Sequence, residues 1–171
     1  RMTDISEPDV SVVIAPNNAA DTIQRAILSA AAQREVVVEI IVVDDCSADE
    51  TCEIVSAIGD PAVRLVRLDR NRGPGGARNA GFAAASGRWI AVLDSDDTMR
   101  PDRLQRLIAA NEHADVVVDN LDVLHLDGRV ERMFPADLLA RTPVLTLADF
   151  IDSNRIFRST HNHGYMRPGF R

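Results

Sequence analysis

The segment Trp89-Ile90-Ala91-Val92-Leu93-Asp94-Ser95-Asp96-Asp97 joins an apolar run to three aspartates. A short apolar run of this kind predicts a β-strand that is covered on both faces, as the strands of parallel sheets are. Open α/β sheets bind ligands beyond the carboxyl ends of their strands. Carboxylates packed this closely repel one another, and a divalent cation such as Mg²⁺ or Mn²⁺ compensates them. The segment therefore predicts a metal site that holds a phosphorylated ligand.

A second acidic pair, Asp44-Asp45, follows the apolar run at residues 40–43. Because parallel strands end at the same edge of a sheet, we expect both acidic clusters to lie there. A carboxylate at this place is suited to bind a nucleobase N–H or a ribose hydroxyl. The alternative is that Asp44, Asp45 or Ser47 caps the next helix. For residues 94–97 the alternative is a solvated acidic turn at a helix N-terminus.

Strand and helix signals alternate through the first part of the chain. Strands are predicted at residues 10–15, 36–43, 63–68, 89–93 and 116–118. Helices are predicted from Asp21 to 32, from Ser47 or Asp49 to 58, at 77–85 and at 101–112, with a loop at 72–76. This alternation predicts an α/β fold with a mainly parallel central sheet and helices on both faces.

The pattern changes near Asn120, where we expect a subdomain boundary. Residues 121–126 and 129–134 flank Asp127-Gly128, which is a strong signal for an antiparallel hairpin. A short helix is predicted at residues 147–153. We expect residues 1–120 to form one unit and residues 121–171 to be the incomplete start of another.

Composition excludes several functions. The net charge of −7 argues against a broad nucleic-acid surface. All 19 basic residues are arginine, so a Walker A loop or a Schiff base is absent. No apolar stretch approaches the roughly 20 residues of a membrane span, and no signal pattern opens the chain. We therefore expect a cytoplasmic protein, and we expect Cys46 and Cys52 to be reduced thiols.

The glycine-rich segment at residues 73–81 is not a dinucleotide fingerprint. Its third glycine would fall at Arg78, and it follows the third predicted strand instead of the first. Its glycines still allow close approach of the backbone to a ligand, and Arg78 offers a charged fork. The alternative is a plain turn that leads into a helix.

Together these motifs resemble family-2 glycosyltransferases of the GT-A fold. The resemblance rests on residues 10–20, 42–51, 71–81 and 94–97, in that order, and residues 114–120 and 164–168 are similar to the bacterial exopolysaccharide (succinoglycan-type) branch. It implies a Rossmann-like three-layer sandwich and an inverting hexosyltransferase with Mg²⁺ or Mn²⁺ as cofactor. The implied donor is a nucleoside-diphosphate sugar, with uridine as the family default. The implied acceptor is a saccharide or lipid-linked saccharide, with peripheral association at the inner face of the membrane.

The resemblance also implies roles on the nucleoside side of the site. Asp45 would bind the base, while Ala15 and Asn17 would line the base pocket. The family usually has an aromatic residue where Asn17 stands. Stacking on a base is worth about 1–3 kcal/mol, so its loss would weaken donor binding without abolishing it.

On the phosphate side, the resemblance implies that Asp96 approaches the ribose and the metal. Asp97 would coordinate the metal, and Arg78 would support the nucleotide or its phosphates. The family's general base normally sits in a later Glu-Asp motif, and no adjacent Glu-Asp pair follows Asp97 here. The catalytic base is therefore not identified.

Three alternative functions remain open. Asp94-x-Asp96-x-Thr98 also fits the nucleophile motif of haloacid-dehalogenase-like phosphatases, which need a later lysine that this sequence lacks. A sugar-phosphate nucleotidyltransferase would need a glycine-rich loop after the first strand, where residues 16–18 are Pro-Asn-Asn. A non-catalytic nucleotide-sugar-binding relative is the third alternative, and it applies if the whole protein lacks the base; we expect instead that these residues are part of a longer chain.

Overall fold

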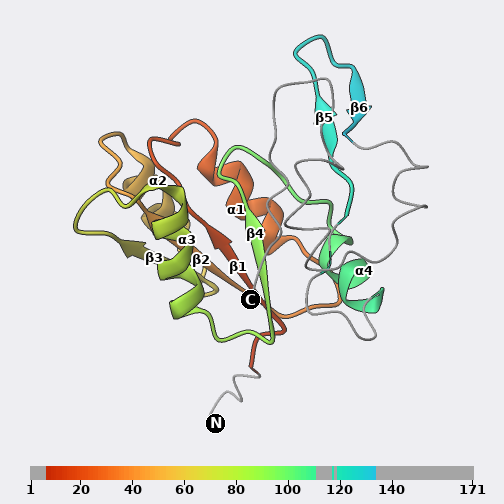
Figure 1. The fold of residues 1–171 in the computed structure, drawn as a ribbon, viewed down its shortest axis with the longest axis horizontal. Coiled ribbons are helices and arrows are strands. Elements are labelled where there is room, and N and C mark those ends of the chain that lie inside the picture. Colours follow the sequence, from red (N-terminus) through yellow and green to blue (C-terminus); the bar gives the residue numbers. More distant parts are fainter. Residues whose placement is uncertain (1–6, 111–116, 118, 134–171) are drawn as a thin grey trace, which may run out of the picture. The chain divides into compact units, whose positions relative to one another are not determined.

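The computed structural model describes residues 7–110, 117 and 119–133 (Figure 1). The chain divides into two compact units, with the boundary after Val117. The elements of the first unit alternate between strand and helix, as predicted. They are β1 (Val10–Ile14), α1 (Ile23–Ala31), β2 (Val38–Asp44), α2 (Thr51–Ala57), β3 (Val63–Arg67), α3 (Gly73–Ala84), β4 (Trp89–Leu93) and α4 (Arg103–Ala109).

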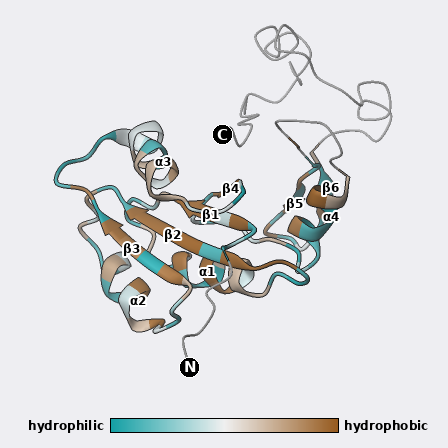
Figure 2. Cartoon of the chain, turned by 90° about the horizontal axis from the view of Figure 1, so that it is seen from below, coloured by the Kyte–Doolittle hydropathy of each residue, from teal (hydrophilic) through white to brown (hydrophobic). Residues whose placement is uncertain are grey.

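The four strands of the first unit form one parallel sheet in the order β3-β2-β1-β4. The hydrophobic strands lie between helices, with α3 on one face and α1 and α2 on the other (Figure 2). This arrangement confirms the predicted three-layer α/β sandwich with a parallel central sheet.

The core consists of two clusters, one on each face of the sheet. Alternate side chains of β1 divide between them: Val12 and Ile14 join the larger cluster, and Val13 joins the smaller one. The larger cluster includes residues of α1, α2 and α4, while Ala77 of α3 belongs to the smaller one. The two central strands β1 and β2 therefore bury apolar side chains on both faces, as parallel strands covered by helices do.

The prediction of a loop at residues 72–76 is wrong, because α3 begins at Gly73. Pro74 occupies the first turn, where its fixed φ and missing N–H suit a helix. Each glycine costs a helix only about 1 kcal/mol, which tertiary packing overrides. Gly81 shows that packing: a Cβ added there would lie 2.4 Å from Cγ1 of Val13.

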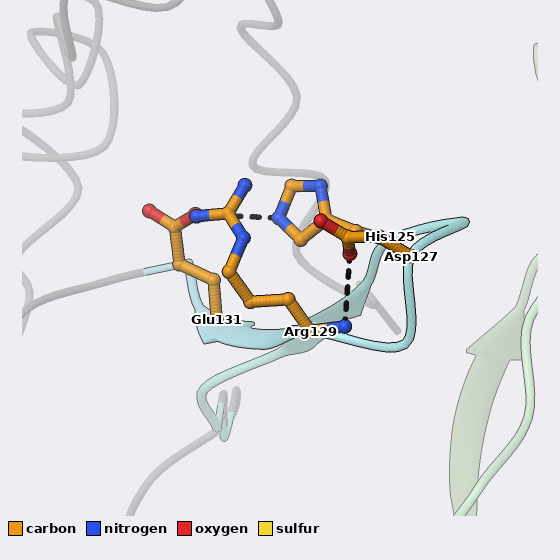
Figure 3. Close-up of polar contacts among 4 residues, drawn as sticks. All are labelled: His125, Asp127, Arg129 and Glu131. Atoms are coloured by element: carbon orange, nitrogen blue, oxygen red, sulfur yellow. Dashed lines mark hydrogen bonds and ion pairs between the residues drawn. The ribbon is translucent and has the colours of Figure 1, made fainter.

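The second unit contributes a short antiparallel hairpin, β5 (Asp122–Leu124) and β6 (Val130–Arg132), and this confirms the predicted hairpin. Gly128 takes a φ of +83° in its turn. Glu131 lies close to both His125 and Arg129 (Figure 3). Its Oε2 is 3.3 Å from Nε2 of His125 and 3.3 Å from Nη1 of Arg129. The strand predicted at residues 116–118 and the helix predicted at 147–153 lie outside the described residues, except Val117, which is not in a strand.

Candidate functional site

Both acidic clusters lie at the carboxyl edge of the parallel sheet. Ile14, the last residue of β1, pairs with Val42 on one side and with Leu93 on the other. Asp44 ends β2, and Asp94 follows β4 directly. The expectation that the clusters share one edge is therefore correct, and this is the edge where α/β sheets bind ligands.

Asp45 joins three loops at this edge. Its main-chain oxygen accepts hydrogen bonds from the side-chain amides of Asn17 (2.8 Å) and Asn71 (3.3 Å). Its carboxylate Oδ1 accepts the amide of Arg72 at 2.6 Å, and its own amide donates to the oxygen of Pro16 at 3.1 Å. Asp45 is only 3% exposed. A buried carboxylate held in this way is stiff, and it keeps further capacity to accept a hydrogen bond.

The loop after β1 carries the other two predicted base-pocket residues. Ala15 is half-buried and packs against the smaller core cluster. Asn17 is exposed, with its amide group directed to Asp45. Asn18 adopts a φ of +55°, and its amide donates to Oγ of Ser47 at 2.9 Å. Asn17 is therefore tied to the backbone at its tip, and it offers no aromatic face to a base.

The capping alternative for the Asp44-Asp45 region does not describe the structure. Ser47 binds Asn18 instead of the first turn of α2. Asp49 takes that place, because its Oδ1 accepts the amide of Thr51 at 3.1 Å. Asp44 accepts the amide of Ser47 at 3.2 Å, which closes a local turn before the helix.

Cys52 lies in α2 near Asp44 and is buried, while Cys46 is exposed. Burial, together with the hydrogen bond and the charge of Asp44, raises the pKa of the Cys52 thiol to about 11. Both cysteines are free, as expected. The Cys52 thiol therefore stays protonated and unreactive at neutral pH.

The acidic loop after β4 is tied to both helical layers. Arg78 of α3 forms an ion pair with the carboxylate of Asp94, and its side chain is only 13% exposed. Arg25 of α1 donates from Nη2 to the main-chain oxygen of Asp96 at 3.0 Å. The amide of Asp97 donates to the oxygen of Asp94 at 3.1 Å and closes a turn.

Asp96 and Asp97, the predicted metal ligands, are exposed in this turn. Partial desolvation raises the pKa of Asp97, and the charges of Asp96 and Asp94 raise it further. Arg25 and Arg103 act in the opposite direction without cancelling the shift. Burial and the neighbouring carboxylates therefore both disfavour the charged form of Asp97.

This donor set fits a divalent cation that the protein shares with a ligand. Among the described residues, no three His, Cys, Asp or Glu side chains converge into a complete metal site. Mg²⁺ needs no such cage, since it is usually held by one or two carboxylates, waters and substrate phosphates. Asp96 and Asp97 supply two carboxylates of that kind at a solvent-accessible turn.

Three residues of the site were not predicted from the sequence. Asn71 and Arg72 hold Asp45, and Arg25 holds the acidic loop. Asn71 and Arg72 adjoin the glycine-rich segment, and this position was the sequence feature that could have indicated their role in the site. No sequence feature indicated the role of Arg25, because arginines on the solvent face of a helix are common. Arg78 contacts Asp94, and its predicted role toward a nucleotide stays a prediction.

A parallel sheet covered on both faces, with a buried carboxylate and an acidic turn at one edge, is typical of a GT-A-type α/β domain. Residues 11–171 match the model of glycosyl transferase family 2, and the chain belongs to that family. The chain is 66% identical over 165 residues to the succinoglycan biosynthesis protein ExoO of Rhizobium meliloti. The aligned region covers 95% of this chain and 47% of ExoO. The chain thus spans about half the length of the curated relatives it matches.

Solved structures agree with this assignment. Residues 1–349 of S. aureus TarS in complex with UDP-GlcNAc match with a TM-score of 0.55 and 31% identity, over 60% of this chain and 30% of TarS. The mannosyltransferase PcManGT of Pyrobaculum calidifontis, in complex with GDP-Man and Mn²⁺, matches with a TM-score of 0.59 and 25% identity, over 66% of this chain and 34% of PcManGT. Among the described residues, no helix has the length and apolar character needed to cross a bilayer.

Proposed function

We propose that this chain carries the donor-binding half of a metal-dependent glycosyltransferase. The enzyme moves a sugar from a nucleoside-diphosphate sugar to an acceptor hydroxyl. The observation that carries the proposal is the placement of the buried Asp45 carboxylate and the Asp96-Asp97 turn on one edge of the sheet. Family membership and the nucleotide-sugar complexes of TarS and PcManGT support it. Residues 1–120 are the proposed nucleotide-sugar unit.

The proposed donor is a UDP-sugar. The second carboxylate oxygen of Asp45 accepts the N3–H of uracil, while Oδ1 stays bound to the amide of Arg72. Ala15 and Asn17 line the pocket beside it. Because Asn17 supplies no aromatic face, base recognition depends more on the hydrogen bond to Asp45 than on stacking.

Asp97 and Asp96 would hold Mg²⁺ or Mn²⁺ against the diphosphate, with Asp96 also near the ribose. A bound divalent cation would neutralise the charge that develops on the departing diphosphate. Asp94 does not take part directly, since its carboxylate is paired with Arg78. Attack by an acceptor hydroxyl on the opposite face of the sugar would invert the anomeric centre. A carboxylate base would take the hydroxyl proton, and the nucleoside diphosphate would leave with the bonding electron pair.

The acceptor half begins at residue 121 and includes the β5–β6 hairpin. We propose a saccharide or lipid-linked saccharide acceptor in the synthesis of a succinoglycan-type exopolysaccharide, because of the 66% identity to ExoO. We propose that the enzyme works in the cytoplasm, at the inner face of the membrane, where a lipid-linked acceptor would lie.

Release of nucleoside diphosphate tests this function. The full-length protein is incubated with UDP-glucose, UDP-GlcNAc or GDP-mannose, with Mn²⁺ or with EDTA, and the released nucleotide is measured. We expect Mn²⁺-dependent release of UDP, which a saccharide acceptor increases. NMR of the product would show the inverted anomer. Turnover of a generic aryl phosphate without any release from these sugars would instead support the phosphatase alternative.

A nucleotide-sugar-binding relative without catalysis is the second candidate. Mn²⁺-dependent binding of UDP without transfer or hydrolysis by the full-length protein would establish this second candidate in place of the first.

A further inference from the structure

A polar stripe on α1 and the residues just after it faces the segment that carries the acidic turn. Arg25, Ser29 and Gln33 follow one another at intervals of four, so they lie along one side of the helical path. Each of the three makes a hydrogen bond to the main chain between residues 96 and 104. The opposite side of α1 is apolar and packs into the larger core cluster.

The first two members hold the turn itself. Arg25 donates to the oxygen of Asp96 at 3.0 Å, and Oγ of Ser29 accepts the amide of Met99 at 3.0 Å. Asp97 lies between these two fixed points, within a span of only four residues. The backbone at Asp97 is therefore held on both sides by side chains of α1.

The third member holds the far end of the segment. Nε2 of Gln33 donates to the oxygen of Arg100 at 2.8 Å, and its Oε1 accepts the amide of Leu104 at 3.0 Å. The amide of Arg34 adds a main-chain hydrogen bond to Pro101 at 2.9 Å. The backbone of residues 100–104 is thus held by a side chain, that of Gln33, and by a main-chain group, the amide of Arg34.

Core packing makes the same segment rigid. Met99 is 5% exposed and Leu104 is 3% exposed, and both belong to the larger core cluster. Each is therefore held twice, by its side chain in the core and by its amide on the stripe. The tie at Asp96 is different, because Arg25 and Asp96 are both exposed. Of the three side chains of the stripe, Arg25 is therefore the one whose loss should affect metal binding at the turn most directly.

Arg25 has two opposite effects on a cation at this turn. Its positive charge lies near Asp97 and would repel the cation. Its hydrogen bond to Asp96 would hold the two carboxylates ready for it, which lowers the entropy lost on binding. The sign of the net effect distinguishes a positioning residue from a charge that merely lies nearby.

We propose that Arg25, Ser29 and Gln33 are positioning residues that hold the Asp96-Asp97 turn in its cation-binding conformation. Arg25 is the tie nearest to the cation, and its positioning effect outweighs its repulsion. The inference rests on the proposed function, since it assumes that the turn binds a cation together with a nucleoside diphosphate.

Titration of the full chain with Mn²⁺ at saturating UDP, followed by electron paramagnetic resonance of free Mn²⁺, tests the proposal. Arg25→Ala should weaken Mn²⁺ binding by about three- to tenfold, the range expected for one hydrogen bond. Arg64→Ala is the matched control. Arg64 is also exposed and also donates to a main-chain oxygen, but that oxygen belongs to Ala84 at the end of α3. Unchanged or tighter Mn²⁺ binding in Arg25→Ala would overturn the proposal.

Hydrogen exchange supplies a readout that does not depend on the metal. Without Mn²⁺ or UDP, the amides of Asp97 and Met99 should exchange faster in Arg25→Ala than in the wild type, while β1 stays protected. If Arg25→Ala is poorly folded, Arg25→Met keeps the aliphatic stem, and the same two results are expected. Equal exchange and equal Mn²⁺ affinity in that variant would count against the stripe. Wild-type protein that binds no Mn²⁺ with UDP would instead refute the proposed function itself.

Discussion

Arg78 of α3 and Asp94 at the end of β4 form an ion pair that connects one helical layer to the acidic turn. The two partners differ in exposure, because 13% of the Arg78 side chain and 53% of the Asp94 side chain are accessible. A guanidinium that is largely buried depends on its partner, since it cannot lose its charge. Asp94 is therefore a support for the site.

We expect Asp94→Asn to destabilise the fold by about 1–2 kcal/mol, which is less than the loss for a fully buried pair because Asp94 is half exposed. Asp96→Asn, in the same turn, should change stability by less than about 0.5 kcal/mol. Urea unfolding of both variants and of Arg78→Met measures these effects. Strict additivity of Asp94→Asn and Arg78→Met would show that the pair is not coupled.

Glu39 gives the fold a predictable pH dependence. Burial alone would raise its pKa, but hydrogen bonds from Ser11, from the amide and hydroxyl of Ser86 and from the amide of Gly87 outweigh it, so the pKa lies below its ordinary value of 4.5. A lowered carboxyl pKa stabilises the fold above the unfolded-state pKa, and this contribution is lost as the pH falls through the folded-state value. Glu39→Gln should therefore be less stable than the wild type at pH 7.

The stability difference between wild type and Glu39→Gln should shrink as the pH falls below about 4.5. Denaturant unfolding between pH 7 and pH 3 measures it. The control is Glu53→Gln, which changes an exposed residue of α2. A stability difference that stayed constant across this range would contradict the role given to Glu39.

Gly81 permits the close approach of α3 to the sheet. Gly81→Ala places a Cβ 2.4 Å from Val13 and 3.2 Å from Val43, so we expect it to destabilise the fold by about 1–3 kcal/mol through overpacking. Gly75→Ala is the matched control in the same helix, because no atom lies within 4 Å of its added Cβ. That variant should be neutral or more stable by up to about 1 kcal/mol. Thermal unfolding of both variants would test the contrast, and equal effects would refute it.

The strands and the shared edge of the sheet could be predicted from the sequence. Short apolar runs such as residues 40–43 predict buried strands. Parallel pairing of these strands then brings Asp44 and Asp94 to one edge of the sheet. The start of α3 could not be predicted, because the cost of its glycines is small beside the packing of Gly81 on the sheet. The glycines and the proline at residues 73–76 therefore suggested a loop, whereas tertiary contacts place the start of α3 at Gly73.

The supports of the site were the other part that the sequence did not reveal. Arg25 reaches an oxygen 71 positions away, and nothing in its neighbourhood indicates that partner. Asn17 illustrates the same limit, since its identity showed a missing aromatic residue but not its bond to the main-chain oxygen of Asp45. Such side-chain to main-chain contacts leave no periodic pattern in a sequence.

Asp45 should determine the preference for uracil. Asp45→Asn keeps an oxygen for the amide of Arg72 but replaces an acceptor by a donor, so it should bind UDP about tenfold more weakly. Cytosine has no proton on N3, and the variant should therefore lose most of its preference for UDP over CDP. Fluorescence competition without metal measures both affinities. An unchanged UDP-to-CDP ratio would remove Asp45 from base recognition.

The central claim is that a cation joins the Asp96-Asp97 turn to the diphosphate of a donor. Calorimetric titration of UDP into the wild type and into Asp97→Asn, with Mn²⁺ and with EDTA, tests it most directly. We predict that Mn²⁺ strengthens UDP binding to the wild type and has no such effect on Asp97→Asn, while circular dichroism shows both proteins folded. Equal Mn²⁺-dependent binding by the two proteins would contradict the claim.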